Sequence, residues 1–252
     1  MLILRSVLFN LAFYVWTTIC CFGLLWMLFI PRRRMVEVVK AYMRTLYWLE
    51  RRIIGLDYRV TGLENLPKQG AYLVGAKHQS LWETMKIHLI LGDPAIILKW
   101  ELLFIPIWGW YAAKARMIAV RRGKRGSAVT SMLDGARRVR DEGRPIVIFP
   151  QGTRTAPGEY RAYKIGIGLL YEDLDLPLVP VALNSGMFWG RRTFIRRPGT
   201  ITVEILPPIP PGLGKDAALS LLEAQVETAS DRLVTAVGGP PTPRPVPDAI
   251  PA

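Results

Sequence analysis

An uncharged apolar run near the N-terminus constrains this chain more than any other feature. From Ser6 to Ile30 there is no charged side chain, and Leu, Phe, Trp and Ile are frequent. As a helix, a run of about 25 residues rises roughly 37 Å, which is enough to cross a hydrocarbon core of about 30 Å. The run is too long for a typical signal-peptide core, and no small-x-small cleavage site precedes Pro31. We therefore expect a retained membrane segment, either spanning the bilayer or lying partly embedded in it.

The residues after this run predict an orientation and a second helix. Arg32 to Arg34 follow directly, and such cations favour the cytoplasmic side, so we expect the rest of the chain on the cytoplasmic face of the inner membrane. Met35 to Ile54 has apolar residues at helical spacing and predicts an amphipathic helix that ends near Gly55. Residues 1–55 are thus expected to form a membrane-associated helical hairpin. Four charged residues are expected on the polar side of the second helix: Arg44, Glu50, Arg51 and Arg52.

The formal net charge of +13 indicates an anionic partner. An anionic bilayer and nucleic acid are both candidates, and each Lys or Arg near an anionic surface contributes on the order of 1 kcal/mol of attraction. Because the chain already carries a membrane segment, we favour the bilayer and expect no nucleic-acid partner. Cys20 and Cys21 are the only cysteines and are adjacent in the apolar run, so a disulfide scaffold and a cysteine metal site are excluded.

From residue 56 to residue 238 the pattern predicts an α/β domain. Short apolar runs predict strands, and longer amphipathic segments between them predict helices. This alternation is typical of a mostly parallel central sheet flanked by helices. Residues 239–252 are dominated by proline and are expected to form an extended, disordered tail. The expected strands cover 71–76, 95–98, 117–120, 145–149, 178–183 and 201–206, and the expected helices begin near 80 and cover 127–142, 163–174 and 216–237.

A histidine lies at the junction of an expected strand and an expected helix, in the segment KHQSLWE at residues 77–83. A helix that begins there brings Glu83 back to the His78 imidazole, because the spacing is little more than one turn. The carboxylate would fix the tautomer of the ring and stabilise the imidazolium that forms when His78 takes a proton. A structural histidine is the alternative interpretation. The other histidine, His88, has no such setting and is expected to pack or to lie at the surface.

A second polar segment also follows an expected strand and reads FPQGTRT at residues 149–155. A glycine turn followed by hydroxyl and guanidinium groups suits a cluster of anionic oxygens, because arginine can donate two hydrogen bonds to phosphate at once. The segment lacks the Gly-x4-Gly-Lys-[Ser/Thr] pattern, so a nucleotide P-loop is not supported. A tight turn whose Arg154 pairs with a neighbouring acid is the structural alternative.

Together these segments resemble the glycerolipid acyltransferase family. That family has a His-x4-Asp block and a later block around Phe-Pro-Glu-Gly-Thr-Arg-Ser, and two weaker blocks resemble residues 99–122 and 179–186 here. Their order and approximate spacing match from about residue 63 to residue 206. Three positions depart from the family pattern. Glu83 stands where aspartate is commoner, Gln151 stands where glutamate is commoner, and Arg121 replaces the usual acid beside Arg122.

The resemblance implies a role for each matched residue. His78 would be the general base, and Glu83 would orient it. Val179 and Pro180 would help to shape the acyl-donor region. The resemblance further implies transfer of an acyl group from acyl-CoA or acyl-ACP to the free sn-2 hydroxyl of lysophosphatidic acid, which gives phosphatidic acid without a covalent intermediate, a cofactor or a metal. The residues implied to hold the phosphate are Gly152, Thr153, Arg154, Lys99, Arg122 and Lys164.

Three alternatives remain open from the sequence. The acceptor could be another lysolipid, such as a lyso-ornithine lipid. The chain could instead be a non-catalytic membrane adaptor that binds lipid, or a basic protein that binds nucleic acid. Residues 186–197 interleave aromatic and basic side chains, which suits either a second contact with the membrane interface or a packed loop with solvated arginines.

Overall fold

Short apolar runs form one seven-stranded sheet in the computed structural model, which describes residues 1–121 and 125–243. The strand order is β1-β7-β6-β2-β5-β3-β4, and every neighbouring pair is parallel except the antiparallel pair of β6 and β7. The expected α/β fold with a mostly parallel sheet is therefore confirmed. The strands span Leu56–Thr61 (β1), Leu73–Ala76 (β2), Ala95–Lys99 (β3), Ile118–Val120 (β4), Ile146–Ile148 (β5), Leu178–Leu183 (β6) and Gly199–Ile205 (β7).

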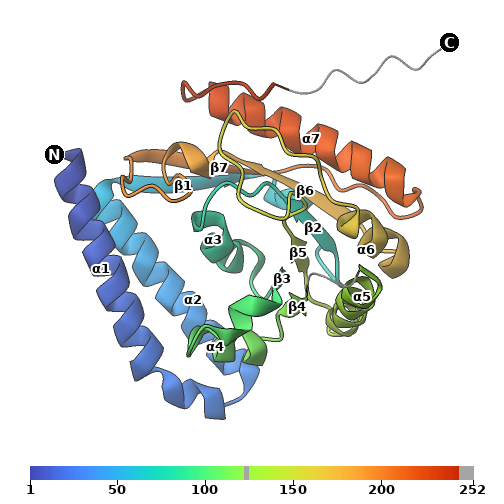
Figure 1. Cartoon of the computed structure of the whole chain (residues 1–252), viewed down its shortest axis with the longest axis horizontal. Helices are drawn as coiled ribbons and strands as arrows, with labels where there is room; N and C mark the ends of the chain where they lie inside the picture. The colour runs from blue at the N-terminus through green and yellow to red at the C-terminus, as the bar shows by residue number, and fades with distance from the viewer. Residues whose placement is uncertain (122–124, 244–252) are drawn as a thin grey trace.

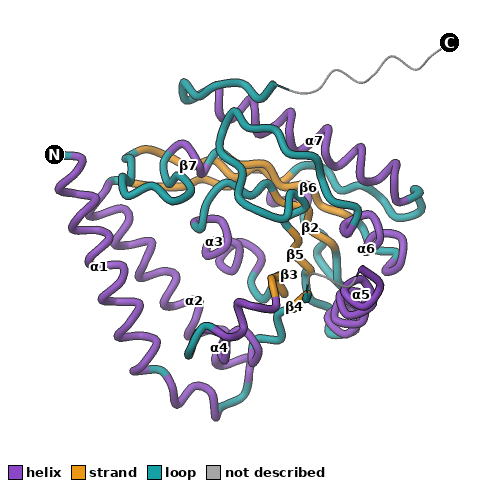
Figure 2. The backbone as a smooth tube through the Cα atoms, in the orientation of Figure 1, coloured by secondary structure: helices purple, strands orange, loops and turns teal. Residues whose placement is uncertain are grey.

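Helices cover both faces of this sheet (Figures 1 and 2). The α-helices of the described residues span Leu2–Gly23 (α1), Arg32–Leu49 (α2), Trp82–Leu91 (α3), Trp108–Lys114 (α4), Arg125–Asp141 (α5), Gly166–Leu174 (α6) and Lys215–Thr235 (α7). Shorter helical segments span Leu25–Phe29 (η1), Glu50–Ile54 (η2), Leu63–Asn65 (η3), Trp100–Phe104 (η4) and Ser185–Met187 (η5). One core contains side chains of α1, α2 and α3, and a second core contains side chains of α5, α6 and α7.

The alternation of side chains along the central strands produces these two cores. In β2, Leu73 faces the α5–α7 core and Val74 faces the α1–α3 core, and Leu178 and Val179 divide in the same way in β6. Successive residues of a strand point to opposite faces, so a strand covered on both faces has no polar side. For this reason both strands read as continuous apolar runs in the sequence.

Two elements have no counterpart among the expected ones. β1 alternates apolar residues with Asp57 and Arg59 and forms one edge of the sheet, where it pairs with β7. An edge strand tolerates polar side chains, so it lacks the continuous apolar run that marks the central strands. α4 has only seven residues, which is too short for a helical periodicity to emerge.

The N-terminal segments form the expected helical hairpin. α1 and α2 run side by side in opposite directions and are joined through η1 (Figure 1). With 22 residues, α1 is about 33 Å long, and its length and composition suffice to cross a membrane. Only 17% of its most apolar 18-residue window is buried inside the protein. The rest of that surface is therefore available to another apolar medium.

The hairpin also packs on the α/β domain. The ring of Phe9 meets that of Trp189 edge-on at 5.3 Å, and the Ser6 hydroxyl accepts the Arg196 backbone N–H at 3.0 Å. Leu46 and Ile54 are fully buried in the same core as the strand residues. These contacts make the hairpin one of the layers that complete the fold. The change from η2 to β1 falls at Gly55, where the domain boundary is predicted and where φ is +70°.

The expectation that Glu50 lies on the polar side of the second helix is wrong. Its side chain is 1% exposed, and it forms an ion pair with Lys86 at 2.9 Å. Leu46, Glu50 and Ile54 recur every four residues and are all buried. In a regular α-helix, positions four residues apart drift by about 40° per step. Glu50 follows Leu46 by a regular α-helical turn, and the wider π-helical turn of η2 then offsets this drift between Glu50 and Ile54.

The aromatic and basic residues 186–197 form a packed loop in part. Trp189 is buried, and the Arg196 guanidinium lies over its ring at 4.6 Å from the centroid. Phe194 is 54% exposed, while its backbone carbonyl accepts a hydrogen bond from Asn10 of α1 at 3.0 Å. The proposed contact of this loop with a membrane stays a prediction. In the predicted tail, the Gly239 N–H donates to the carbonyl of residue 234 at 3.0 Å, and residues 244–252 lie outside the described residues.

A pair of glycine-to-alanine substitutions tests the packing around α4. A Cβ at Gly109 would lie 2.0 Å from the Leu103 carbonyl oxygen, whereas a Cβ at Gly126 in α5 meets no atom within 4 Å. We expect Gly109→Ala to lower the free energy of unfolding by about 2 kcal/mol, because the clash is with backbone. Gly126→Ala should leave it unchanged or raise it by up to about 1 kcal/mol. Denaturant unfolding in detergent measures both, and equal stabilities would contradict the observed close approach.

Candidate active site

The two polar segments singled out in the sequence lie together where the central strands β2 and β5 end. β2 and β5 are parallel neighbours, so the segments that follow them leave the sheet at the same end of the strands. The Thr155 N–H donates to the His78 carbonyl at 2.8 Å, and the His78 N–H donates to Gln151 Oε1 at 3.1 Å. Residues 77–83 and 149–155 therefore form one site, which is a condition for any shared substrate.

A single carboxylate, that of Glu83, organises this site. Its Oε1 lies 2.8 Å from His78 Nδ1 and also accepts the backbone N–H groups of Gln79 and Ser80 at 2.7 and 2.6 Å. Its Oε2 accepts the Ser185 hydroxyl at 2.7 Å. The side chain is 2% exposed. Four hydrogen-bonding partners thus hold the carboxylate in one position beside the imidazole.

The start of α3 explains why Glu83 can reach back. The Ser80 hydroxyl accepts the Trp82 N–H at 3.1 Å, while the Glu83 carboxylate accepts the Ser80 N–H. Ser-x-x-Glu is the sequence signature of a capping box, and the glutamate half of that box is formed here, while the serine hydroxyl accepts the N–H of Trp82 in place of that of Glu83. The added methylene of glutamate relative to aspartate is accommodated, because the dyad distance is that of an ordinary hydrogen bond.

The His78 ring is held on its face as well as at its edge. It stacks on Phe149 with 4.1 Å between the ring centroids and 20° between the planes. Its side chain is 16% exposed, so the ring is confined but reachable. Because Nδ1 is engaged by Glu83, Nε2 is the ring nitrogen that can exchange a proton with a ligand.

The second histidine is chemically different. His88 lies farther along α3, and burial is the main cause that lowers its pKa to about 4, with Asp93 acting in the opposite direction. Its imidazole is therefore neutral near pH 7, and its side chain is half-buried, between the packed and the surface position expected for it. Between the two histidines, only His78 has a carboxylate within hydrogen-bonding distance in the described residues.

Gln151 supports the His78 segment by hydrogen bonding and without charge. The side chain is fully buried, and its Oε1 accepts the His78 backbone N–H. Its Nε2 has no hydrogen-bond partner among the described residues. On the other side of the site, Gln79 Oε1 accepts the Gly186 N–H at 2.9 Å, which ties the segment after β6 to the same turn.

Four of the six expected phosphate-binding residues lie in one loop. Gly152 has φ of +70°, and a Cβ there would lie 2.9 Å from Lys164 Nζ, so the lysine lies directly against the glycine. Thr153 and Arg154 follow in the same turn, and both are half-buried. The Arg191 guanidinium donates to the Arg154 carbonyl at 2.9 Å. Hydroxyl, guanidinium and ammonium groups are thus gathered beside the His78 turn.

The other two expected phosphate-binding residues are less closely placed. Lys99 is the last residue of β3, which lies beside β5 in the sheet. Its side chain is exposed at the same end of the strands. Arg122 lies outside the described residues. Its neighbour Arg121 lies over the Trp100 ring at 5.2 Å from the centroid.

The residues expected in the acyl-donor region are inside the sheet. Val179 and Pro180 are buried in β6, where they pair with Val74 and Gly75 of β2. They support the strand that leads to Ser185 and Gly186. A direct contact of either side chain with an acyl donor stays a prediction.

A buried ion pair anchors the His78 turn to the last helix. Lys77 Nζ lies 2.6 Å from Glu227 Oε2 of α7, and Glu227 Oε1 accepts the Tyr163 hydroxyl at 2.9 Å. Lys77 is 2% exposed and Glu227 is 1% exposed. Lys77, the residue before His78, is therefore held in place by α7.

Sequence reasoning missed Ser185 and Phe149 as site residues. Ser185 lies 102 positions from Glu83, and its only signal is its place in the short segment that resembles a family block. Phe149 is the first residue of the FPQGTRT segment and also the last residue of an expected strand, so its pattern is that of an ordinary strand end. Among residues 1–121 and 125–243, no group of three His, Cys, Asp or Glu side chains could hold a metal ion. The expectation of a reaction without metal or cofactor stays a prediction.

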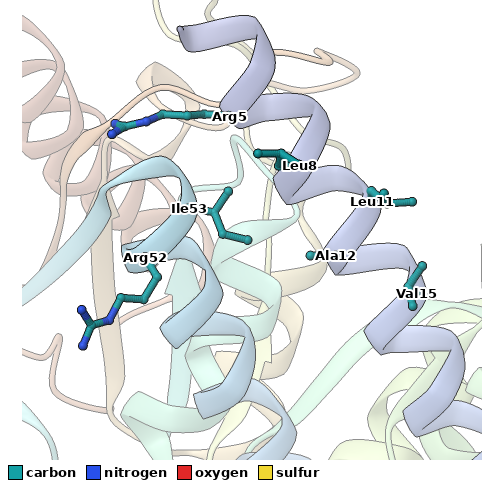
Figure 3. Close-up of a pocket in the computed structure, with 7 residues that line it drawn as sticks. All are labelled: Arg5, Leu8, Leu11, Ala12, Val15, Arg52 and Ile53. Atoms are coloured by element: carbon teal, nitrogen blue, oxygen red, sulfur yellow. The ribbon is translucent and has the colours of Figure 1, made fainter.

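An open groove lies apart from this site, between α1 and η2 (Figure 3). Its volume is about 680 Å³. Apolar side chains dominate it, and arginines stand where α1 begins and where η2 lies. None of the His78, Glu83 or FPQGTRT residues lines it, so it does not serve the dyad directly. The lining residues are Arg5, Leu8, Leu11, Ala12, Val15, Arg52 and Ile53.

Comparison with known proteins decides the family. Residues 57–184 match the family model described as Acyltransferase, and this range contains the dyad and the FPQGTRT turn. This chain belongs to the acyltransferase family. The match begins with the second residue of β1 and ends at Asn184, so it leaves out the N-terminal hairpin and α7.

Named members of this acyltransferase family resemble the chain over most of its length. The 1-acyl-sn-glycerol-3-phosphate acyltransferase of Pseudomonas aeruginosa is 34% identical over 208 residues, which cover 81% of this chain and 80% of that protein. The enzyme of the same name from Limnanthes douglasii is 27% identical over 195 residues, which cover 76% and 69%. The crystal structure of the 1-acyl-sn-glycerophosphate acyltransferase of Thermotoga maritima superposes with a TM-score of 0.76 at 23% identity and covers 92% of this chain and 98% of that chain. The acyltransferase fold therefore includes the hairpin.

A matched pair of serine substitutions tests the Glu83 network. Ser185→Ala removes one hydrogen bond to the carboxylate, and a hydrogen bond to a charged group contributes about 1.5–3 kcal/mol. We expect kcat for acyl transfer to fall about tenfold or more. Ser230→Ala is the control, since the Ser230 hydroxyl is buried in α7 without a partner in the described part of the chain. Equal kcat values for the two variants would remove Ser185 from the network.

Proposed function

We propose that this protein transfers an acyl group from a thioester donor to the sn-2 hydroxyl of lysophosphatidic acid, giving phosphatidic acid for phospholipid synthesis. The name and similarity of the Pseudomonas relative support this acceptor. The observation that carries the proposal is the joining of the dyad to the FPQGTRT turn through the two backbone hydrogen bonds of His78. One substrate can then present its hydroxyl to the base and its phosphate to the loop that carries Arg154 and Lys164, which we call the cationic loop.

The dyad geometry supports His78 as the group that accepts the proton of the substrate. With Nδ1–H donated to the Glu83 carboxylate, His78 Nε2 has a free lone pair and accepts the proton of the substrate hydroxyl. The alcohol oxygen attacks the thioester carbonyl carbon, the C–S bond breaks, and the thiolate takes the proton from the imidazolium. An ester and a free thiol result. No nucleophilic side chain of the protein is consumed, in keeping with the location of both cysteines in α1.

The cationic loop supplies orientation. Arg154 and Lys164 would bind the phosphate of the acceptor, with the Thr153 hydroxyl and the close backbone approach at Gly152 completing the clamp. Lys99 would add positive charge from the end of β3, and the resemblance to the family assigns Arg122 to the same role. Holding the phosphate at a fixed distance from the base converts binding energy into alignment of the attacking oxygen.

The hairpin supports a location at the membrane. The exposed apolar surface of α1 matches a lipid environment in which both the acceptor and the product reside. The arginines after η1 favour the cytoplasmic face of the inner membrane, where acyl-CoA and acyl carrier protein are found. Acyl-CoA or acyl-ACP would then reach the site from the aqueous side.

Removing the base tests the mechanism. We expect His78→Ala to lower kcat by about 10²-fold or more, because no second base is positioned at the dyad. The variant should still sediment with membranes, since the hairpin is unchanged. Thiol release from acyl-CoA in the presence of lysophosphatidic acid measures the rate. The control is His88→Asn, which should retain activity. Near-normal turnover of His78→Ala would exclude His78 as the base.

Removing one phosphate ligand tests the acceptor. We expect Arg154→Ala to raise the KM for lysophosphatidic acid about tenfold or more, because a charge-assisted hydrogen bond is lost. Arg138→Ala, on the exposed side of α5, removes the same charge far from the loop and should leave KM unchanged. A panel of lysolipids with both CoA and carrier-protein thioesters completes the experiment. An unchanged KM for Arg154→Ala would favour an acceptor with a different headgroup, such as a lyso-ornithine lipid.

A further inference from the structure

A second buried ion pair joins η2 to α3 and plays no part in the proposed chemistry. Glu50 of η2 contacts two residues of α3. Its Oε1 accepts Lys86 Nζ at 2.9 Å, and its Oε2 accepts the Trp82 indole N–H at 3.1 Å. All three side chains are at most 1% exposed. The Lys86 ammonium also lies over the rings of Tyr47 and Trp82, at 5.2 and 5.8 Å from their centroids.

Stability alone does not account for this pair. Burial raises the pKa of the Glu50 carboxyl, although Lys86 opposes that change, and burial lowers the pKa of the Lys86 ammonium. Both directions mean that the buried surroundings disfavour the charges. A fully buried ion pair often contributes less to stability than apolar side chains of equal volume, whereas loss of one partner is costly. What such a pair does supply is a fixed geometry between two elements.

The two elements fixed here are the hairpin and the helix that carries the dyad carboxylate. Trp82 directly precedes Glu83, and Lys86 follows it by one turn. Glu50 therefore holds the first turn of α3 at two points, on either side of Glu83 in the sequence. Glu50 is the first residue of the π-helical turn η2, and such turns are frequent at functional sites.

From these contacts we infer that Glu50 is a positioning residue for the acyl-transfer reaction. The buried contact from η2 to α3 sets the orientation of Glu83 and, through it, of His78. The hairpin thereby contributes to catalytic alignment in addition to membrane attachment. This inference rests on the proposed function, since it assigns Glu50 to the same dyad.

The experiment compares Glu50→Gln with the wild type as full-length protein in vesicles that contain lysophosphatidic acid. Glutamine retains an oxygen for the Trp82 N–H and removes the charge opposite Lys86. We expect kcat to fall about tenfold or more, because a small displacement of a catalytic group is sufficient for such a loss. The KM for lysophosphatidic acid should change less than about twofold, because the phosphate loop is untouched. The acid limb of the pH–rate profile should move to lower pH, since a displaced Glu83 stabilises the imidazolium less.

A destabilised control separates positioning from loss of fold. Val139→Ala removes buried methyl groups from α5, in the opposite core, and should lower the melting temperature without changing kcat or the pH profile well below that temperature. If Glu50→Gln does not fold, the double variant Glu50→Gln/Lys86→Met replaces it, because this variant has no unpaired buried charge. Its kcat, KM and pH–rate profile are then compared with those of the wild type. Wild-type kcat and an unshifted pH profile in a folded Glu50 variant would overturn the inference and leave the function intact. A wild-type protein without acyl transfer would instead refute the proposed function.

Discussion

The site depends on one buried carboxylate. Glu83 meets the His78 ring and two backbone N–H groups of the turn after β2, and it also meets the Ser185 hydroxyl of the segment after β6. Four donors hold the carboxylate in one orientation, which is the condition for directing the proton chemistry of the imidazole. The neighbouring residues therefore hold the Glu83 carboxylate in place before any ligand binds.

Charges inside the layers tie the elements together around that carboxylate. Lys77 and Glu227 join the end of β2 to α7, and Glu50 and Lys86 join η2 to α3. Each pair crosses from one element to another without contact with solvent, so neither partner can move independently. The turn that carries His78 is thus held from the α5–α7 layer, while the helix that carries Glu83 is held from the hairpin.

The fold and the dyad could be predicted from the sequence because they leave local patterns. Continuous apolar runs marked the central strands, and the spacing of His78 and Glu83 fits a single helix start. Contacts between distant segments leave no such pattern, as Ser185 shows. Glu50 was expected on the polar side because it stands beside two arginines, and its contacts with Trp82 and Lys86 on a distant helix leave no local pattern. The roles of Arg154, Lys164 and the other matched residues came from the resemblance to a family, and their contacts with substrate stay predictions.

The pairing of β1 with β7 has a consequence for the order in which the protein assembles. β1 follows the hairpin directly, yet its partner strand begins at Gly199, near the end of the chain. During synthesis the hairpin and β1 leave the ribosome long before β7 does, because domains are made from the N-terminus onward. The apolar helix can therefore reach the lipid phase while the sheet is still open at that edge. Closure of the sheet at that edge therefore waits for the late strand β7.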